Sequence, residues 1–352
     1  MKKFLYEIAI GQRQGFWISL LKILLWVLSL IYRLGSGTIV CLYQFGLVKR
    51  HQLPKPVISV GNITLGGVGK TPLVALIARM LKDKGLKPVI LIRGYMGHCT
   101  DAESDEAALL RKTLEGVPVL VGSNRIKNAN EFLKDKDCDV FLLDDGFQYW
   151  CLARDLDIVA IDTKNPWGNR CLIPRGILRE PLRSLKRADL FILTKTDQGH
   201  DNTIKVKEQL TRINPDKMIV ETIHEPLALL EMRRNEAKEL LLIKGKDICS
   251  FCSIGNPGSF ESTLKSLGCH LRKNFSFMDH HVYTPEDIQA ISQYCRENKI
   301  NTVITTEKDA VKVGDLLSNF GHEIAIYYLK IKATITSGED EFRERLEHIL
   351  QR

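Results

Sequence analysis

The sequence predicts an α/β protein with a doubly wound, mainly parallel sheet and a second, smaller α/β domain. Three observations lead to this prediction. The chain has 352 residues, which is more than one compact core usually contains. Short apolar runs typical of buried strands alternate with stretches of helical periodicity. One of these runs also leads into a glycine-rich loop that opens a helix.

Strands are expected in the first half at Pro56–Val60, Pro88–Ile92, Val117–Val121, Asp139–Asp145, Leu156–Ile161 and Leu190–Leu193. In the second half they are expected at Met218–Thr222, Leu240–Ile243, Ile248–Ile254 and Thr302–Thr305. Helices are expected at Leu73–Lys84, Ser259–Leu267, Pro285–Asn298 and Glu339–Leu350. We divide the chain into a helical segment over 1–52, a nucleotide-binding domain over 53–200 and the smaller domain over 201–352, with a possible hairpin linker near 240–254.

Composition and charge narrow the class of protein. With 44% hydrophobic and 26% charged residues, the chain is neither disordered nor a low-complexity protein. The net charge is +8, and +7 of it lies in the first 55 residues. No stacking platform or basic groove accompanies that charge, so a nucleic acid partner is not indicated. Nine scattered cysteines fit a reducing compartment, and we interpret Cys249 and Cys252 as inert core thiols.

The N-terminal charge surrounds an apolar run, Phe16 to Tyr32. Its polar and small residues fall on one helical stripe, which predicts an amphipathic helix lying in a membrane interface among anionic headgroups. A helix that spans the membrane and a helix buried in the protein's own core are the alternatives. A secretory signal is disfavoured, because no cleavage site follows the run.

The glycine-rich loop has the pattern of a phosphate-binding P-loop between a strand and a helix. Its glycines let backbone N–H groups surround phosphate oxygens, and the helix N-terminus contributes its positive dipole. Lys70 is expected to reach the β- and γ-phosphates and the Thr71 hydroxyl to hold Mg²⁺. The expected nucleotide-binding residues of the loop are Thr64, Leu65, Gly66, Gly67, Val68, Gly69, Lys70 and Thr71.

Two carboxylates, Asp144 and Asp145, end an apolar strand and are expected beside the P-loop as Mg²⁺-side ligands. Other acids follow strands or open helices at 104–106 and 279–281, where an Asp with a nearby imidazole would suit a base that accepts a hydroxyl proton. A helix N-cap is the alternative for each of them. The stretch Leu193–Asp197 has a weak similarity to a guanine-reading loop.

Seven motifs in order resemble the tetraacyldisaccharide 4′-kinase family, the lipid A 4′-kinases of Gram-negative bacteria. They are Val60–Pro72, Arg93-Gly-Tyr95, Asp144-Asp-Gly-Phe-Gln148, Leu172–Pro181, Ile254-Gly-Asn-Pro257, Asp279-His-His281 and Thr306–Lys312. The sequence differs from the family pattern at Met96, Ser104, Ala107 and Tyr149.

The resemblance implies a P-loop NTPase-like fold, ATP as donor, Mg²⁺ as cofactor and a cleft between two domains. It implies Asp105 as the catalytic base, His280 as its support, Gln148 as a polar partner, and Arg179, with Arg125, as phosphate ligands. The expected reaction moves the γ-phosphate of ATP to the 4′-hydroxyl of a tetraacyldisaccharide 1-phosphate. The expected place is the cytoplasmic face of the bacterial inner membrane, with no obligate protein partner. The alternatives are a membrane-associated P-loop ATPase or GTPase switch and a nucleotide-sensing scaffold.

Overall fold

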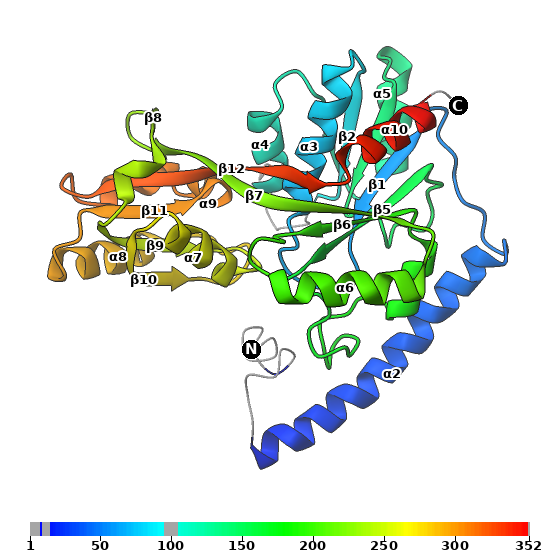
Figure 1. Cartoon of the computed structure of the whole chain (residues 1–352), viewed down its shortest axis with the longest axis horizontal. Coiled ribbons are helices and arrows are strands. Elements are labelled where there is room, and N and C mark those ends of the chain that lie inside the picture. The colour runs from blue at the N-terminus through cyan, green and yellow to red at the C-terminus, as the bar shows by residue number, and fades with distance from the viewer. Residues whose placement is uncertain (1–7, 9–14, 95–104, 351–352) are drawn as a thin grey trace. The chain divides into compact units, whose positions relative to one another are not determined.

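The computed structural model describes residue 8 and residues 15–94 and 105–350. The chain forms two compact units, and Figure 1 labels those of their elements for which there is room. The larger unit comprises Met1–Thr100, Leu114–Ile223 and Ile335–Arg352, and the smaller comprises Asp101–Thr113 and His224–Thr334.

This division differs from the expected boundary at residue 200. The segment that begins at Asp105 groups with the smaller unit, where Lys112 Nζ donates to Tyr328 Oη at 3.1 Å. The last residues return to the larger unit, where Glu347 forms an ion pair with Lys84. Two long strands connect the units, and where they run through the larger unit the Thr336 hydroxyl donates to the Glu221 carbonyl at 3.3 Å.

The larger unit contains a parallel sheet with the strand order β3-β2-β4-β1-β5-β6-β7. Its strands are β1 (Val57–Gly61), β2 (Pro88–Ile92), β3 (Val119–Val121), β4 (Val140–Asp144), β5 (Leu156–Asp162), β6 (Leu190–Thr194) and the first part of β7 (Met218–Glu231). Its helices are α2 (Phe16–Gln44), α3 (Lys70–Asp83), α5 (Arg125–Asp135), α6 (His200–Ile213), the 3₁₀ helix η1 (Leu182–Arg187) and α10 (Glu339–Leu350). This arrangement confirms the predicted fold class.

Burial explains why the strands of this sheet read as continuous apolar runs. Every residue of β1, β2, β4, β5 and β6 is buried, as expected for parallel strands covered on both faces. Helix α3 contributes Leu73, Ile77 and Leu81, each at most 2% exposed. Each such side chain contributes about 1.5–3 kcal/mol by leaving water. The helix that follows the P-loop is therefore fixed against the sheet by its own apolar stripe.

The smaller unit contains the parallel strand order β10-β9-β11-β12. Its elements are α4 (Asp105–Thr113), β8 (Glu236–Lys238), η2 (Leu240–Ile243), β9 (Asp247–Cys252), α7 (Pro257–Ser266), β10 (His270–Ser276), α8 (Pro285–Glu297), β11 (Thr302–Thr306), α9 (Glu307–Lys312), η3 (Gly314–Asn319) and β12 (Ala325–Ser337).

Two predictions for this region are wrong. The segment Leu240–Ile243 is a 3₁₀ helix and not a strand, and the expected hairpin is absent because β9 pairs in parallel with β10 and β11. Short apolar runs do not distinguish a strand from a helical turn. Here Leu240 and Ile243 pack on the same hydrophobic cluster, which the three-residue period of a 3₁₀ helix allows.

The thiols of Cys249 and Cys252 are both buried and free in β9. Burial raises the pKa of Cys252 to about 12. A thiol with such a pKa is protonated at neutral pH and is a poor nucleophile. The structure therefore agrees with the interpretation of both residues as core thiols and of Cys252 as an inert one.

Helix α2 is longer than the predicted run, because it continues through Gly35 and Gly37 to Gln44. It is long and apolar enough to cross a membrane by length and composition. Only Leu25 and Ser29 are buried along it, so the interpretation as a helix of the protein's own core is wrong. Its contacts with the rest of the larger unit are specific: Ser29 Oγ donates to the Leu172 carbonyl at 2.9 Å, and Tyr32 Oη donates to the Arg179 carbonyl at 2.8 Å.

Candidate active site

The P-loop follows β1 and opens α3, as its sequence pattern requires. Gly66 and Gly69 have φ values of 109° and 92°, which glycine adopts without a steric penalty. A glycine is also required at Gly61, since a Cβ there would lie 2.5 Å from Phe147 Cβ. The loop is held from the side by a hydrogen bond from the Leu65 amide to the Ile177 carbonyl at 2.7 Å.

The last residue of β6 and the residue that follows it hold the P-loop from a second side. The Thr194 hydroxyl donates to the Val68 carbonyl at 2.7 Å, and Lys195 Nζ donates to the Gly67 carbonyl at 2.8 Å. Lys195 is 2% exposed and forms an ion pair with Asp162 at 2.5 Å. Thr194 and Lys195 belong to the stretch with a weak similarity to a guanine-reading loop, and here they support the backbone of the P-loop.

Four side chains converge at the start of α3. The Asp145 carboxylate accepts from Arg179 at 2.7 Å and lies 3.4 Å from Lys70 Nζ. Asn62 Oδ1 accepts from the same lysine at 3.1 Å and lies 3.4 Å from Arg179 NH1. Burial raises the pKa of Asp145, but the two cations outweigh it and hold the pKa far below its usual range. The carboxylate is therefore ionised at every physiological pH.

Asp144 ends β4, the strand beside β1, and is 4% exposed. Asp144, Asp145 and the hydroxyl of Thr71 in the first turn of α3 are hard oxygen donors of the kind that Mg²⁺ prefers. No group of three or more His, Cys, Asp and Glu side chains that could hold a metal occurs within 15–94 and 105–350. Mg²⁺ usually takes one or two carboxylates and completes its shell with phosphate and water.

A buried network lies behind this cluster. The Gln148 amide donates to the Asn62 carbonyl and to Glu180 Oε1, each at 3.0 Å. Glu180 is 1% exposed and pairs with both terminal nitrogens of Arg187, at 2.6 and 2.7 Å. Arg187 also donates to the Phe147 carbonyl at 2.9 Å. Gln148 thus links the end of β1 to a buried ion pair.

Two further arginines hold the loop that contains Asp144 and Asp145. Arg125 is 4% exposed and donates to the Asp144 carbonyl at 2.8 Å, with its guanidinium 4.0 Å from the centre of the Tyr149 ring. Arg154 donates to the Gly146 carbonyl at 3.1 Å. Arg125 therefore contacts the loop backbone and lies in the interior, which differs from its expected contact with phosphates.

The second cluster of titratable groups lies in the smaller unit. Asp105, at the start of α4, lies 3.5 Å from His280 Nδ1 and 2.9 Å from Lys312 Nζ. Lys312 also donates to the Ser253 hydroxyl at 2.9 Å, and Lys308 pairs with Asp279 at 3.0 Å. The structure therefore brings Asp105 and His280 together, as the family resemblance implies.

The electrostatics of this cluster favour an ionised Asp105. Burial of the side chain raises its pKa, but hydrogen bonds from His280 and Lys312 and the charge of Lys312 outweigh that effect and lower the pKa to about 2. The carboxylate is therefore an acceptor throughout the neutral range and binds a proton only weakly.

Several residues of the two clusters were not predicted to have a role. Asn62, Glu180 and Arg187 belong to or follow recognised motifs, and Lys312 closes the last one. A motif identifies a segment, whereas only the fold shows which side chains of it meet. Tyr95, Met96 and Ser104, which belong to or adjoin recognised motifs, lie outside the described residues.

Comparisons with known proteins agree with these observations. A family model described as tetraacyldisaccharide-1-P 4′-kinase matches residues 21–351. A tetraacyldisaccharide 4′-kinase of Syntrophus aciditrophicus is 37% identical over 84% of this chain and 85% of its own, and one of Halothermothrix orenii is 36% identical over 91% of each. The crystal structure of LpxK from Aquifex aeolicus in complex with ATP is similar, with a TM-score of 0.72 and 29% identity over 94% of this chain and 99% of that one.

Proposed function

The chain belongs to the tetraacyldisaccharide-1-P 4′-kinase family, and we propose that the two clusters described above carry out the reaction of that family. The protein is an ATP-dependent kinase that transfers the γ-phosphoryl group to the 4′-hydroxyl of a tetraacyldisaccharide 1-phosphate. The observation that carries the residue assignment is the P-loop itself, whose Lys70 lies beside an ionised carboxylate at the end of the strand next to β1.

The P-loop cluster binds the nucleotide in this proposal. Backbone N–H groups of the P-loop surround the phosphates, Lys70 contacts the β- and γ-phosphates, and Arg179 neutralises charge on the transferring group. Thr71, Asp144 and Asp145 would hold Mg²⁺, which would neutralise phosphate charge. The network of Gln148, Glu180 and Arg187 keeps these side chains in place, because a preorganised site does not reorganise during the reaction.

Asp105 orients the acceptor hydroxyl and accepts its proton, and His280 positions the carboxylate. A pKa of about 2 makes Asp105 a weak base. This suits a largely dissociative phosphoryl transfer, in which little proton transfer is needed before the bond to the leaving oxygen breaks. The contribution of Asp105 is then mainly an aligned hydrogen bond, and Lys312 keeps the carboxylate ionised.

We infer that α2 holds the protein at the cytoplasmic face of the inner membrane by lying in the interface. Large apolar side chains are exposed along it, including Trp17 at 79% and Leu34 at 72%. Ser29 and Tyr32 lie near the middle of the helix and are bonded to the folded unit. A spanning orientation would bring that unit into the hydrocarbon core, so the interface is the favoured location.

The test is transfer of labelled phosphate from ATP to tetraacyldisaccharide 1-phosphate in neutral detergent micelles, with separation of the lipid product. We expect labelled lipid with the wild-type chain and none with Lys70→Ala, whose folding is checked by circular dichroism. Release of inorganic phosphate without labelled lipid would instead indicate the ATPase switch. Replacement of His280 by Asn, which keeps a hydrogen-bonding group, should cost less than Asp105→Ala if His280 acts only through Asp105.

A further inference from the structure

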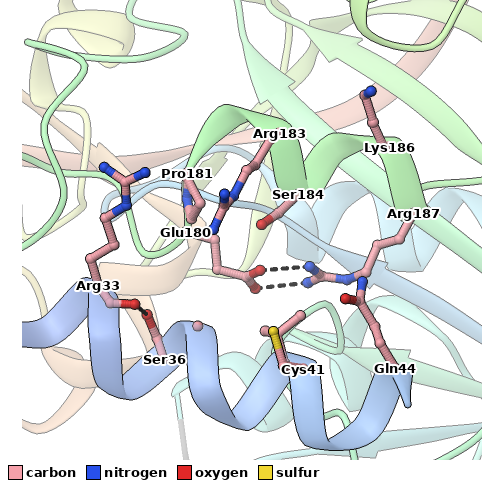
Figure 2. A pocket seen from close by; sticks show the side chains of 12 residues that line it. Arg33, Ser36, Cys41, Gln44, Glu180, Pro181, Arg183, Ser184, Lys186 and Arg187 are labelled. Carbon is pink, nitrogen blue, oxygen red and sulfur yellow. Dashed lines mark hydrogen bonds and ion pairs between the residues drawn. The ribbon is translucent and has the colours of Figure 1, made fainter.

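A cavity of about 400 Å³ lies between the C-terminal half of α2 and the segment that contains η1, and Figure 2 shows its side chains. It is lined by Arg33, Ser36, Gly37, Val40, Cys41, Gln44, Glu180, Pro181, Arg183, Ser184, Lys186 and Arg187. None of the P-loop residues, Asp145 or Arg179 belongs to this lining. The cavity is therefore not the nucleotide site.

The charge of the cavity is strongly positive. Its only carboxylate is Glu180, which is already paired with Arg187. For the side chains of Arg33, Arg183 and Lys186, no hydrogen bond or ion pair to another described residue is found. Figure 2 shows Arg33 reaching from α2 toward the segment above it, and Arg183 reaching from that segment toward α2, whereas the Lys186 amine points away from α2. Two arginines thus stand on opposite walls of the cavity.

The position of this cavity is fixed by the helix with the exposed apolar surface. Tyr32 anchors α2 to the Arg179 carbonyl, and Arg33 is the next residue. Exposed Leu34 and Ile39 belong to the same half of the helix, and exposed Phe45 follows its last residue. A basic cavity that opens beside such a helix lies at the depth where phospholipid phosphates are found when the helix is in the interface.

We propose that this cavity binds the phosphate headgroup of an anionic membrane phospholipid, with Arg33 and Arg183 as its ligands. The planar guanidinium groups match phosphate oxygens better than an ammonium group does. This proposal rests on the membrane association of α2 in the proposed function. The ligand is distinct from the acceptor lipid, and it fixes how the larger unit sits on the membrane surface.

The first experiment measures sedimentation of the full chain with vesicles of phosphatidylcholine, with and without phosphatidylglycerol. We expect phosphatidylglycerol to strengthen binding of the wild type. Arg183→Gln should bind the phosphatidylglycerol vesicles about fivefold more weakly than the wild type, because one basic residue at the surface contributes about 1 kcal/mol. Arg183→Lys keeps the charge and should recover only part of the binding that Arg183→Gln loses. Arg212→Gln, an equal charge change on α6 at a side chain 79% exposed, is the matched control and should bind like the wild type.

The second experiment fills the cavity without a change of charge. A Cβ at Gly37 has no atom within 4 Å, and Gly37 lines the cavity, so Gly37→Leu projects a side chain into it. Gly35 has equally open surroundings on the same helix but does not line the cavity, so Gly35→Leu is the matched control. We expect Gly37→Leu to lose the preference for phosphatidylglycerol and Gly35→Leu to keep it.

The outcomes separate this proposal from the proposed function. Equal binding of Gly37→Leu and Gly35→Leu to phosphatidylglycerol vesicles would overturn the cavity as a headgroup site. So would a raised KM for the acceptor lipid with Arg183→Gln in neutral micelles without phospholipid, because the cavity would then hold the acceptor. If the wild type does not bind phosphatidylcholine vesicles, the membrane association of α2 would instead be rejected. If the wild type transfers no phosphate to the acceptor lipid, only the kinase assignment would be rejected.

Discussion

Replacement of Glu180 by Gln tests whether the buried network behind the P-loop is structural support for the nucleotide site. The carboxylate is 1% exposed and makes two contacts with Arg187 and one with the Gln148 amide. The substitution keeps the size of the side chain and removes its charge. Arg187 then retains its hydrogen bond to the Phe147 carbonyl and the contact of its guanidinium with the Phe147 ring, whose centre is 3.7 Å away. It loses its counter-ion.

The size of the effect follows from this burial. Removal of one partner of a buried ion pair costs about 3–5 kcal/mol, because the remaining charge is uncompensated. The Arg187 side chain is 17% exposed and Gln still accepts one hydrogen bond, so we expect about 2–3 kcal/mol, below the lower end of that range. For a unit of about 150–250 residues, this corresponds to a fall in Tm of about 5–10 °C.

The assay is thermal unfolding of the full chain in neutral detergent, with steady-state kinetics at a temperature where all variants are folded. The matched control is Glu347→Gln, which breaks the exposed pair with Lys84 and should cost at most about 1 kcal/mol. We also expect Glu180→Gln to raise the KM for ATP, because Gln148 then holds the end of β1 less firmly. Equal Tm values for the two variants, with an unchanged KM, would refute the reasoning.

Five further predictions concern the clusters and the thiols. Lys70→Ala should abolish phosphate transfer through lost phosphate contacts, measured with labelled ATP. Asp105→Ala should lower kcat by about 10²–10⁴-fold, and near-normal kcat would reject Asp105 as the base. The pKa of Asp105 is about 2, below its unfolded value of 3.8, so this carboxylate should not limit kcat/KM between about pH 5 and 8. Lys312→Met should raise that pKa and move the acid limb of the pH profile upward, and an unmoved limb would contradict the ion pair. Native alkylation followed by mass spectrometry should modify exposed Cys41 and spare buried Cys252.

The sequence predicted best the elements whose pattern is set by burial. The strand Pro88–Ile92 and the helix Glu339–Leu350 have the predicted bounds, because an all-buried strand and an amphipathic helix each have a clear period. The 3₁₀ helix at Leu240–Ile243 was read as a strand, since four apolar residues have no measurable period. The apolar run that predicted the membrane helix ends at Tyr32, whereas α2 continues to Gln44, because the glycines and polar residues there interrupt the apolar run without ending the helix.

The candidate site was predicted to the level of motifs. The P-loop and its acids could be located because a phosphate-binding loop demands glycine, lysine and threonine at fixed spacing. The contact of Lys312 with Asp105 could not be derived from the residues alone, since their segments are far apart in the sequence and meet only when α9 packs on α4. The same reason applies to Arg125, whose interior contact with the Asp144 carbonyl depends on the approach of α5 to the end of β4.

The hydrogen bond between Thr336 and Glu221 has a consequence for synthesis of the chain. It joins the points where the polypeptide leaves the larger unit and returns to it, so the residues between them form an insertion that begins and ends at neighbouring strands. A ribosome releases α10 only after that insertion is complete. The surface of the larger unit that α10 covers therefore stays exposed to solvent while residues 224–334 are synthesised. Because the two ends are adjacent, a short turn between residues 223 and 335 would close this break in the larger unit.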